Sequence, residues 1–113
     1  MLDLEVIDDP AAAAAALEPT RTRILSALVE PGSATTVAGS LGLARQKVNY
    51  HLRALEAHGL VELVEERARR GLVERVVQAT ARSYLVSPVA LGEQVADPAR
   101  TDRLSSRYLI ALA

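Results

Sequence analysis

Residues 44–60 read ARQKVNYHLRALEAHGL, and their apolar side chains recur with the period of one helical face. Val48, Leu52 and Leu55 stand at i, i+4 and i+7, the spacing of a helix that buries one side. Gly59 predicts the end of this helix in a left-handed conformation, with Leu60 placed to contact Leu55. The opposite side carries side chains without a carboxylate: Gln46, Asn49, Tyr50 and Arg53. Every surface helix has a polar face, but an acid-free one suits insertion into the major groove of DNA.

The composition limits what the rest of the chain can be. With 113 residues, the chain is long enough for one compact domain and short for two. It has no cysteine, which excludes disulfides, thiolate metal sites and thiol catalysis. No apolar run approaches the roughly 18 residues of a membrane span, and the N-terminus is acidic rather than basic. We therefore expect a soluble cytoplasmic protein without a membrane partner.

The distribution of charge is more informative than its total. The net charge is −1, which by itself argues against binding to nucleic acid. Residues 1–18, however, hold five acids and no base, so the other 95 residues carry 13 bases and 9 acids. Binding to phosphate depends on local positive charge. Six of the 13 bases gather in two places, on the helix described above (Arg45, Lys47, Arg53) and in the turn that follows it (Arg67, Arg69, Arg70).

Two helices are expected before residue 31. Asp9 and Pro10 form a typical helix start, with Asp as N-cap and Pro in the first turn. The following run, Ala11–Ala16, has very high helix propensity, and its small side chains permit close helix packing, although such a run can also be mere low complexity. A second helix over Thr20–Glu30 ends at Pro31.

A third, shorter helix is expected over Val37–Leu41, capped by Thr35 or Thr36. Gly42 then makes a tight turn into Ala44, which occupies the N-cap of the long helix without a capping side chain. A short helix, a glycine turn and a longer helix have the spacing of a helix-turn-helix. The alternative is an ordinary helical hairpin within a bundle.

After Gly59 the pattern changes from helical to extended. Residues 61–66 alternate and are rich in valine, Arg67–Gly71 is a turn, and Leu72–Thr80 is a second β-branched run. This pattern predicts a β-hairpin with a basic tip. Arginines at a hairpin tip are usually just solvated, but directly after a helix-turn-helix such a hairpin would be a wing. We then expect three arginines to contact DNA phosphate: Arg67, Arg69 and Arg70.

These segments together resemble a known family. The run TTVAGSLGLARQKVNYHLRALEAHGLVELVEER at residues 35–67, continued by RARRGLVERVVQAT at 67–80, is similar to the winged helix-turn-helix of ArsR-type bacterial transcriptional regulators. The similarity spans roughly Pro10–Ser87, and its most specific part is V-x-x-H-L-x-x-L-x-x-x-G-L-V, beginning at Val48.

The resemblance implies a homodimeric repressor or activator that binds double-stranded DNA. The family's recognition-helix positions fall on six residues: Arg45, Gln46, Lys47, Asn49, Tyr50 and Arg53. Metal-sensing members use a cysteine pair near the third helix, where this chain has Ser33-Ala34-Thr35-Thr36-Val37, or Asp/His clusters on the last helix. Because no cysteine is present and no histidine follows His58, we expect no metal and no cofactor.

Catalysis is not expected. The sequence shows no nucleophile, histidine and acid at a recognisable spacing, no glycine-rich phosphate loop and no framed pair of carboxylates. His51 lies at the edge of the apolar face, where a hydrogen-bonded boundary residue is favoured over a catalyst or a phosphate contact. His58 in the last helical turn suits the helix dipole. Tyr84, in an extended segment, is expected to pack on the sheet rather than to bind a ligand.

The C-terminal part is expected to be helical. Val89–Ala96 forms an apolar turn or short helix, and Asp97 caps a helix that runs to the end with an apolar stripe of Leu104, Tyr108, Ala111 and Leu112. Because the chain stops within an apolar run, either a partner buries this helix or the chain is a piece of a longer protein. Together with the alanine-rich helix it would form a dimer interface.

The predicted organisation has three parts. An acidic segment and packing helix occupy residues 1–18, a winged helix-turn-helix occupies 19–87, and a dimerisation segment occupies 88–113. The expected fold is mainly α, with a β-hairpin wing at 61–80 and a recognition helix at 44–58. The expected function is sequence-specific regulation of transcription from a palindromic operator, with the effector, if there is one, left open. The alternative is a winged-helix module that binds protein and not DNA.

Overall fold

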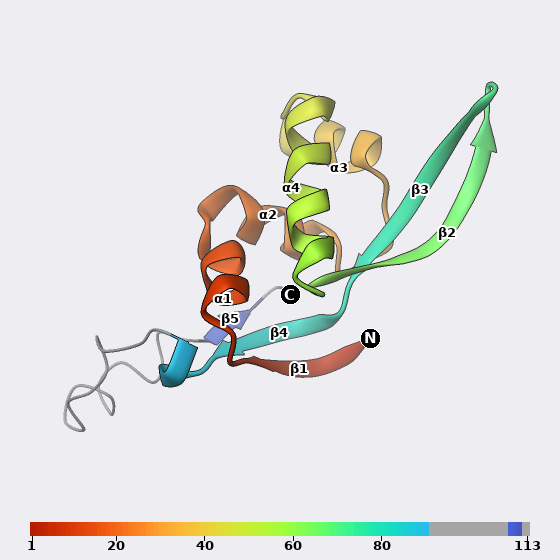
Figure 1. Ribbon diagram of the computed structural model, residues 1–113. Coiled ribbons are helices and arrows are strands. Elements are labelled where there is room, and N and C mark those ends of the chain that lie inside the picture. Colours follow the sequence, from red (N-terminus) through yellow and green to blue (C-terminus); the bar gives the residue numbers. More distant parts are fainter. Residues whose placement is uncertain (91–108, 112–113) are drawn as a thin grey trace.

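The computed structural model describes residues 1–90 and 109–111, and Figure 1 shows helices packed above a small sheet with a long hairpin projecting to one side. The helices are α1 (Pro10–Leu17), α2 (Pro19–Ala27), α3 (Ala34–Leu41) and α4 (Arg45–Ala57). The hairpin consists of β2 (Val61–Arg69) and β3 (Leu72–Ala79), and is called the wing below. The sheet has the order β1 (Leu2–Ile7), β4 (Ala81–Val86), β5 (Leu109–Ala111). The four helices expected before Gly59 and the expected wing are present.

The first two helices follow each other almost without a break, because each has its own cap. The Asp9 carboxylate accepts a hydrogen bond from the backbone N–H of Ala12 (3.1 Å), as its position before Pro10 predicts. Glu18 then caps α2 by accepting from the N–H of Arg21 (2.9 Å). This second cap was not predicted, since glutamate is an uncommon N-cap. It starts α2 one residue before the predicted Thr20.

The predicted cap of the third helix is wrong by two or three residues. Ser33 is the N-cap, with its hydroxyl accepting from the N–H of Thr36 (3.2 Å). The Thr36 hydroxyl accepts in return from the Ser33 N–H (2.8 Å), so Thr36 has the role that Glu or Gln takes in a capping box. As a result α3 begins at Ala34 and is one turn longer than the predicted Val37–Leu41.

The end of α4 has the geometry that Gly59 predicts. Gly59 has φ of 71°, and its N–H donates to the Glu56 carbonyl (3.0 Å). The Leu60 N–H donates to the Leu55 carbonyl (2.9 Å), and both leucines are buried. These two bonds form a Schellman motif, which closes the helix and turns the chain directly into β2. At the other end, Ala44 is the N-cap and makes no side-chain hydrogen bond, as predicted.

The first strand of the wing is longer and the turn tighter than predicted. Arg69 pairs with Leu72, so only Arg70 and Gly71 form the turn. Both have positive φ, 51° and 78°, as a two-residue type I′ turn requires. The predicted turn Arg67–Gly71 is therefore wrong. Arg67 and Arg69 lie in β2, because Arg70 and Gly71 together reverse the chain and no longer loop is needed.

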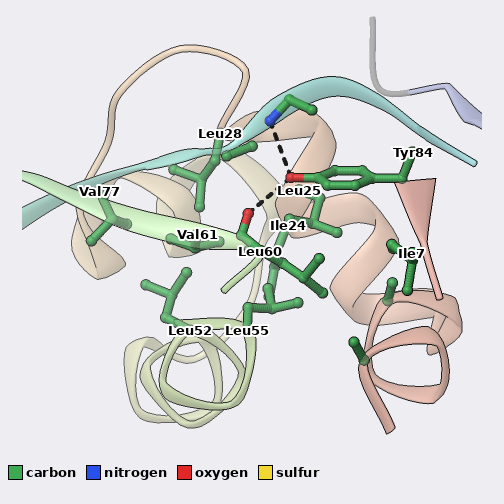
Figure 2. Close-up of a cluster of buried hydrophobic side chains, with 14 of the residues drawn as sticks. Ile7, Ile24, Leu25, Leu28, Leu52, Leu55, Leu60, Val61, Val77 and Tyr84 are labelled. Atoms are coloured by element: carbon green, nitrogen blue, oxygen red, sulfur yellow. Dashed lines mark hydrogen bonds between the residues drawn. The ribbon is translucent and has the colours of Figure 1, made fainter. Parts of the chain in front are cut away.

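The core is formed by the helices closing over the inner face of the sheet. Figure 2 shows Ile24 and Leu25 of α2 and its C-cap Leu28 together with Leu52 and Leu55 of α4, and Tyr84 at the edge of the same cluster. Four alanines of α1 are also buried: Ala12, Ala13, Ala15 and Ala16. α1 thus packs against the rest of the domain, and among its alanines and leucine only Ala11, Ala14 and Leu17 are exposed.

The strand β1 was not predicted. It pairs in parallel with β4, with Leu4 opposite Ser83 and Val6 opposite Leu85. The alternation of Leu2, Leu4 and Val6 with acids is a period-two pattern that the high charge of the segment hid. These three side chains lie on the outer face of the sheet and are about half exposed (55%, 49% and 52%). The N-terminal segment is thus part of the same sheet that follows the wing.

The predicted C-terminal helix is wrong in the part that the structure describes. Leu109–Ala111 forms β5, antiparallel to β4, with Ile110 opposite Tyr84. A helix there would leave that edge of β4 with unpaired backbone groups, whereas a short strand satisfies them. Pro88–Ala90 forms a turn of 3₁₀-helix, in line with the expected turn. The rest of the predicted helix and dimer interface, residues 91–108 and 112–113, lies outside the described residues.

Tyr84 joins the sheet to the wing and to the end of α4. Its side chain is fully buried, and its hydroxyl donates to the Leu60 carbonyl (2.9 Å). The same oxygen accepts from the N–H groups of Thr80 (3.1 Å) and Ala81 (3.2 Å). Burial raises the pKa of this hydroxyl, so it remains a neutral donor. The prediction that Tyr84 packs on the sheet is confirmed.

Replacing Tyr84 by Phe should destabilise the protein by about 1–3 kcal/mol, because the Leu60 carbonyl loses one of its donors and the N–H groups of Thr80 and Ala81 lose the hydroxyl as an acceptor. Urea unfolding followed by circular dichroism measures this change. Tyr50→Phe is the matched control, since Tyr50 is 65% exposed and its hydroxyl should contribute within about 0.5 kcal/mol. Equal stability of the two variants would show that the Tyr84 hydroxyl does not hold the junction together.

Candidate nucleic-acid interface

The helix α4 presents one buried and one exposed side. Val48, Leu52 and Leu55 are buried in the core. The six residues expected to meet DNA are all exposed: Arg45, Gln46, Lys47, Asn49, Tyr50 and Arg53. None of the three cations among them forms an ion pair with a described residue. Their positive charge is therefore available to an external anion.

His51 anchors α4 to α2 instead of facing solvent. It is buried, and its Nδ1 accepts a hydrogen bond from Nε of Arg21 (3.0 Å). Because Nδ1 accepts, the neutral ring carries its proton on Nε2. Burial lowers the pKa of His51, and the charges of Arg21 and Lys47 lower it further against the opposing effect of Glu18. The prediction of a hydrogen-bonded boundary residue is confirmed.

The turn before α4 is held by a second arginine of α2. Nη2 of Arg23 donates to the Leu41 carbonyl (3.2 Å), one of the carbonyls that the end of α3 leaves without a helical partner. Gly42 has φ of 68° and allows the chain to reverse there. Arg21 and Arg23 were not predicted as site residues. They fix the positions of α3 and α4 relative to α2, and no local pattern marks such long-range contacts.

The wing is less basic than its arginines suggest. Arg67 pairs with Glu65 (2.6 Å) and Arg69 with Glu74 (3.6 Å). A hydrogen bond with the Ser33 side chain lowers the pKa of Glu74, and Arg69 and Arg67 lower it further, which keeps this carboxylate charged. Arg70, at the tip, forms no ion pair with a described residue. Of the three arginines predicted to make the tip basic, only Arg70 is therefore without an ion pair to a described residue.

One carboxylate stands at the end of the exposed side of α4. Glu56 follows Asn49 and Arg53 at the i+7 and i+3 positions, on the same side of the helix. Both of its oxygens contact Arg75 of β3, at 2.7 Å and 3.2 Å. The acid-free face therefore ends before Glu56. The contact with Arg75 was not predicted, because it joins positions on different elements.

A crevice separates α4 from the wing. Its helical side includes Arg45, Asn49 and Arg53, and its wing side includes Val73 and Arg75. A second hollow, closer to the tip, is bordered by Arg45 together with Arg69 and Arg70. Arg45 thus lies where the two meet. The two hollows also contain the carboxylates of Glu56 and Glu74, which are paired with Arg75 and Arg69. The cations left without an ion pair to a described residue are Arg45 and Arg53 on α4 and Arg70 on the wing, an arrangement that fits a chain of phosphates.

Two other features are absent from the described residues. No three His, Cys, Asp or Glu side chains in residues 1–90 and 109–111 gather in a way that could hold a metal ion. No helix in the same part of the chain has the length and apolar character to cross a membrane.

Comparisons with known proteins agree with this geometry. Residues 16–64 match a family model described as a helix-turn-helix domain. NolR from Sinorhizobium fredii has a similar structure, with a TM-score of 0.50 at 24% identity over 88% of this chain and 84% of that one. The protein has a winged helix-turn-helix fold.

A second solved structure shares this winged helix-turn-helix. It is a homodimeric DNA-binding domain from Mycobacterium bovis, described as a possible ArsR-family transcriptional regulator. Its TM-score is 0.51 at 22% identity, over 81% of each chain. A sequence comparison with curated proteins gives no significant match. The winged helix-turn-helix that the sequence predicts is confirmed, with α3 and α4 as its two helices and β2–β3 as its wing.

The anchor at His51 makes stability depend on pH. Since its pKa in the folded protein lies below that of the unfolded chain, acid favours the unfolded state. The contribution of neutral His51 to the free energy of unfolding should be fully present above about pH 6.5. It should be lost as the pH falls below that value. His51→Asn keeps an acceptor for Arg21 but cannot titrate. Denaturant unfolding of both proteins from about pH 7.5 to 5.5 tests this, and parallel profiles would contradict it.

Proposed function

We propose that the protein is a sequence-specific DNA-binding transcriptional regulator of ArsR type. The observation that carries the proposal is the exposed side of α4, where Arg45, Lys47 and Arg53 are unpaired around polar groups able to read bases. In this proposal α4 enters the major groove. Gln46, Asn49, Tyr50 and Arg53 reach base edges or adjacent phosphates, and Arg45 and Lys47 mainly contact phosphate.

The crevice between α4 and the wing supports this orientation. A DNA strand that leaves the groove beside α4 would pass Arg45 and then the tip at Arg70. In the structure both arginines border the same hollow. The wing would thus add phosphate contacts next to those of the helix, with little sequence information of its own.

We further propose that the protein acts as a homodimer on a palindromic operator. A single recognition helix reads only a few base pairs, so selectivity normally requires two half-sites about one helical turn apart. The similar Mycobacterium bovis domain is described as homodimeric. Sedimentation at micromolar concentration, with binding to a palindrome compared with one half-site, tests this part. A monomer that binds both equally would contradict it.

A second function is favoured by the apolar surface of the wing. Leu72 is 72% exposed, Val73 is 65% exposed, and the acids and bases around them are mixed. Such a surface is typical of a site that docks another protein. The alternative is therefore a winged-helix module that binds a protein partner and not DNA. The acid-free part of α4 argues against this alternative, because protein-binding surfaces rarely concentrate unpaired charges of one sign.

Selection of duplexes from a random DNA pool tests DNA binding and identifies the operator in one experiment. With that operator, Arg53→Ala should cost about 1–3 kcal/mol, and the loss should depend on the base pair that Arg53 reads. Lys47→Ala should weaken all duplexes alike and reduce the slope of log affinity against log salt by about one. Failure to enrich any duplex would favour the protein-binding module. Sequence-independent losses in both variants would remove Arg53 from readout.

The ion pairs of the wing predict an order among its arginines. Arg70→Ala should weaken binding more than Arg67→Ala at low salt, because Arg67 is already neutralised by Glu65. The difference should shrink as salt increases, as expected for phosphate contacts. Fluorescence anisotropy with the selected duplex at two salt concentrations measures it. If both variants bind like the wild type at low salt, the wing does not touch DNA.

A further inference from the structure

The base of the wing is built into the domain. Gly32 and Val77 exchange two backbone hydrogen bonds (2.9 Å and 2.8 Å), and the Ala79 N–H donates to the Leu28 carbonyl (2.8 Å). The Gln78 side chain donates to the Val29 carbonyl (3.0 Å). These contacts attach the second half of β3 to the segment between α2 and α3. They fix where the wing starts.

The outer half of the wing has no such attachment along its backbone. Every residue from Glu62 to Val73 is exposed, and a register shift between Leu63 and Glu65 bends β2. A two-stranded ribbon is only marginally stable in water by itself. The direction in which the tip points must therefore depend on side-chain contacts beyond the base. Figure 1 shows how far the tip extends from the helices.

The ion pair between Arg75 and Glu56 is a contact of this kind. Arg75 is the first residue beyond the buried Val76 toward the tip, and Glu56 lies in the last turn of α4. The two Nη atoms of Arg75 donate to the two carboxylate oxygens of Glu56 at 2.7 Å and 3.2 Å. Such a two-point contact restrains orientation as well as distance. The hydrogen bond with Glu56 also raises the pKa of Arg75.

The same pair has an electrostatic consequence. Without Arg75, the Glu56 carboxylate would stand uncompensated on the side of α4 that carries Asn49 and Arg53. It would then repel the phosphates of a bound duplex. Charge alone therefore predicts that removal of the Glu56 charge strengthens DNA binding. A positioning role predicts the opposite.

We infer that Glu56 and Arg75 are positioning residues, whose ion pair holds the outer wing at a fixed angle to α4 and so sets where Arg70 meets the DNA. The inference rests on the proposed function for its effect on binding. The restraint itself is a property of the free protein and can be measured without DNA.

The first experiment is the titration of Glu56→Gln with the selected duplex. We expect affinity to fall about two- to fivefold, the range that the loss of an exposed ion pair allows, although the variant has lost a negative charge. Glu62→Gln is the matched control. It removes an exposed wing carboxylate without an ion pair to a described residue, so its affinity should stay equal or rise. If Glu56→Gln binds as tightly as the wild type or more tightly, the positioning role is wrong.

A combined variant shows whether the effect passes through the tip. With Arg70→Ala already present, Glu56→Gln should cause no further loss of DNA affinity. The tip then carries no arginine whose position could affect binding. Additive losses would mean that Glu56 acts on DNA binding by another route, which also overturns the inference. Unchanged thermal unfolding of each variant shows that the domain is intact.

The second experiment measures the angle directly in the free protein. The chain has no cysteine, so Ser40→Cys on α3 and Leu72→Cys near the tip can carry a pair of spin labels at chosen positions. Pulsed electron resonance should give a narrow distance distribution with Glu56 and a broader one after Glu56→Gln. Equal widths would overturn the restraint. If no duplex binds but the widths differ, the proposed function fails and the restraint stands.

Discussion

The carbonyl oxygen of Leu60 is the point on which the arrangement of α4, wing and sheet depends. It accepts from the Tyr84 hydroxyl (2.9 Å) and from the Thr80 N–H (3.1 Å), while the Leu60 N–H closes α4. Leu60 thus ends α4, leads into the wing and contacts the chain again where the wing returns to the sheet. Because the side chains of Leu60 and Tyr84 are both buried, these bonds form away from competing water.

Sequence patterns predict the elements whose signals are local. The periodicity of α4, its end at Gly59, the start of α1 at Asp9 and the alternation of the wing each depend on residues a few positions apart. Local patterns did not predict the cap at Ser33, because Thr36 occupies the N3 position that Glu or Gln usually takes in a capping box. For β1 and β5 the partner strand β4 lies far along the chain, and pairing with it overrides local propensity.

The candidate site divides in the same way. Periodicity alone identifies the exposed side of α4, since its opposite side must be buried. It cannot show which cations are already neutralised. Arg67 and Arg69 look equivalent to Arg70 in sequence, yet the extended strand β2 places Glu65 on the same side as Arg67, and its pairing with β3 brings Glu74 to Arg69. Likewise, His51 and Arg21 are thirty positions apart, and their hydrogen bond exists only because α2 crosses α4.

The turn of the wing places an arginine where the backbone would favour another residue. Arg70 has φ of 51°, the only positive value among the non-glycine residues that the structure describes. Asparagine before glycine suits such a turn far better, whereas an arginine there is held in a sparsely populated conformation. A hairpin selected for stability alone would not keep a long cation at this position. Under the proposed function, the tip of the wing gives up some conformational stability in order to place a charge beside the DNA.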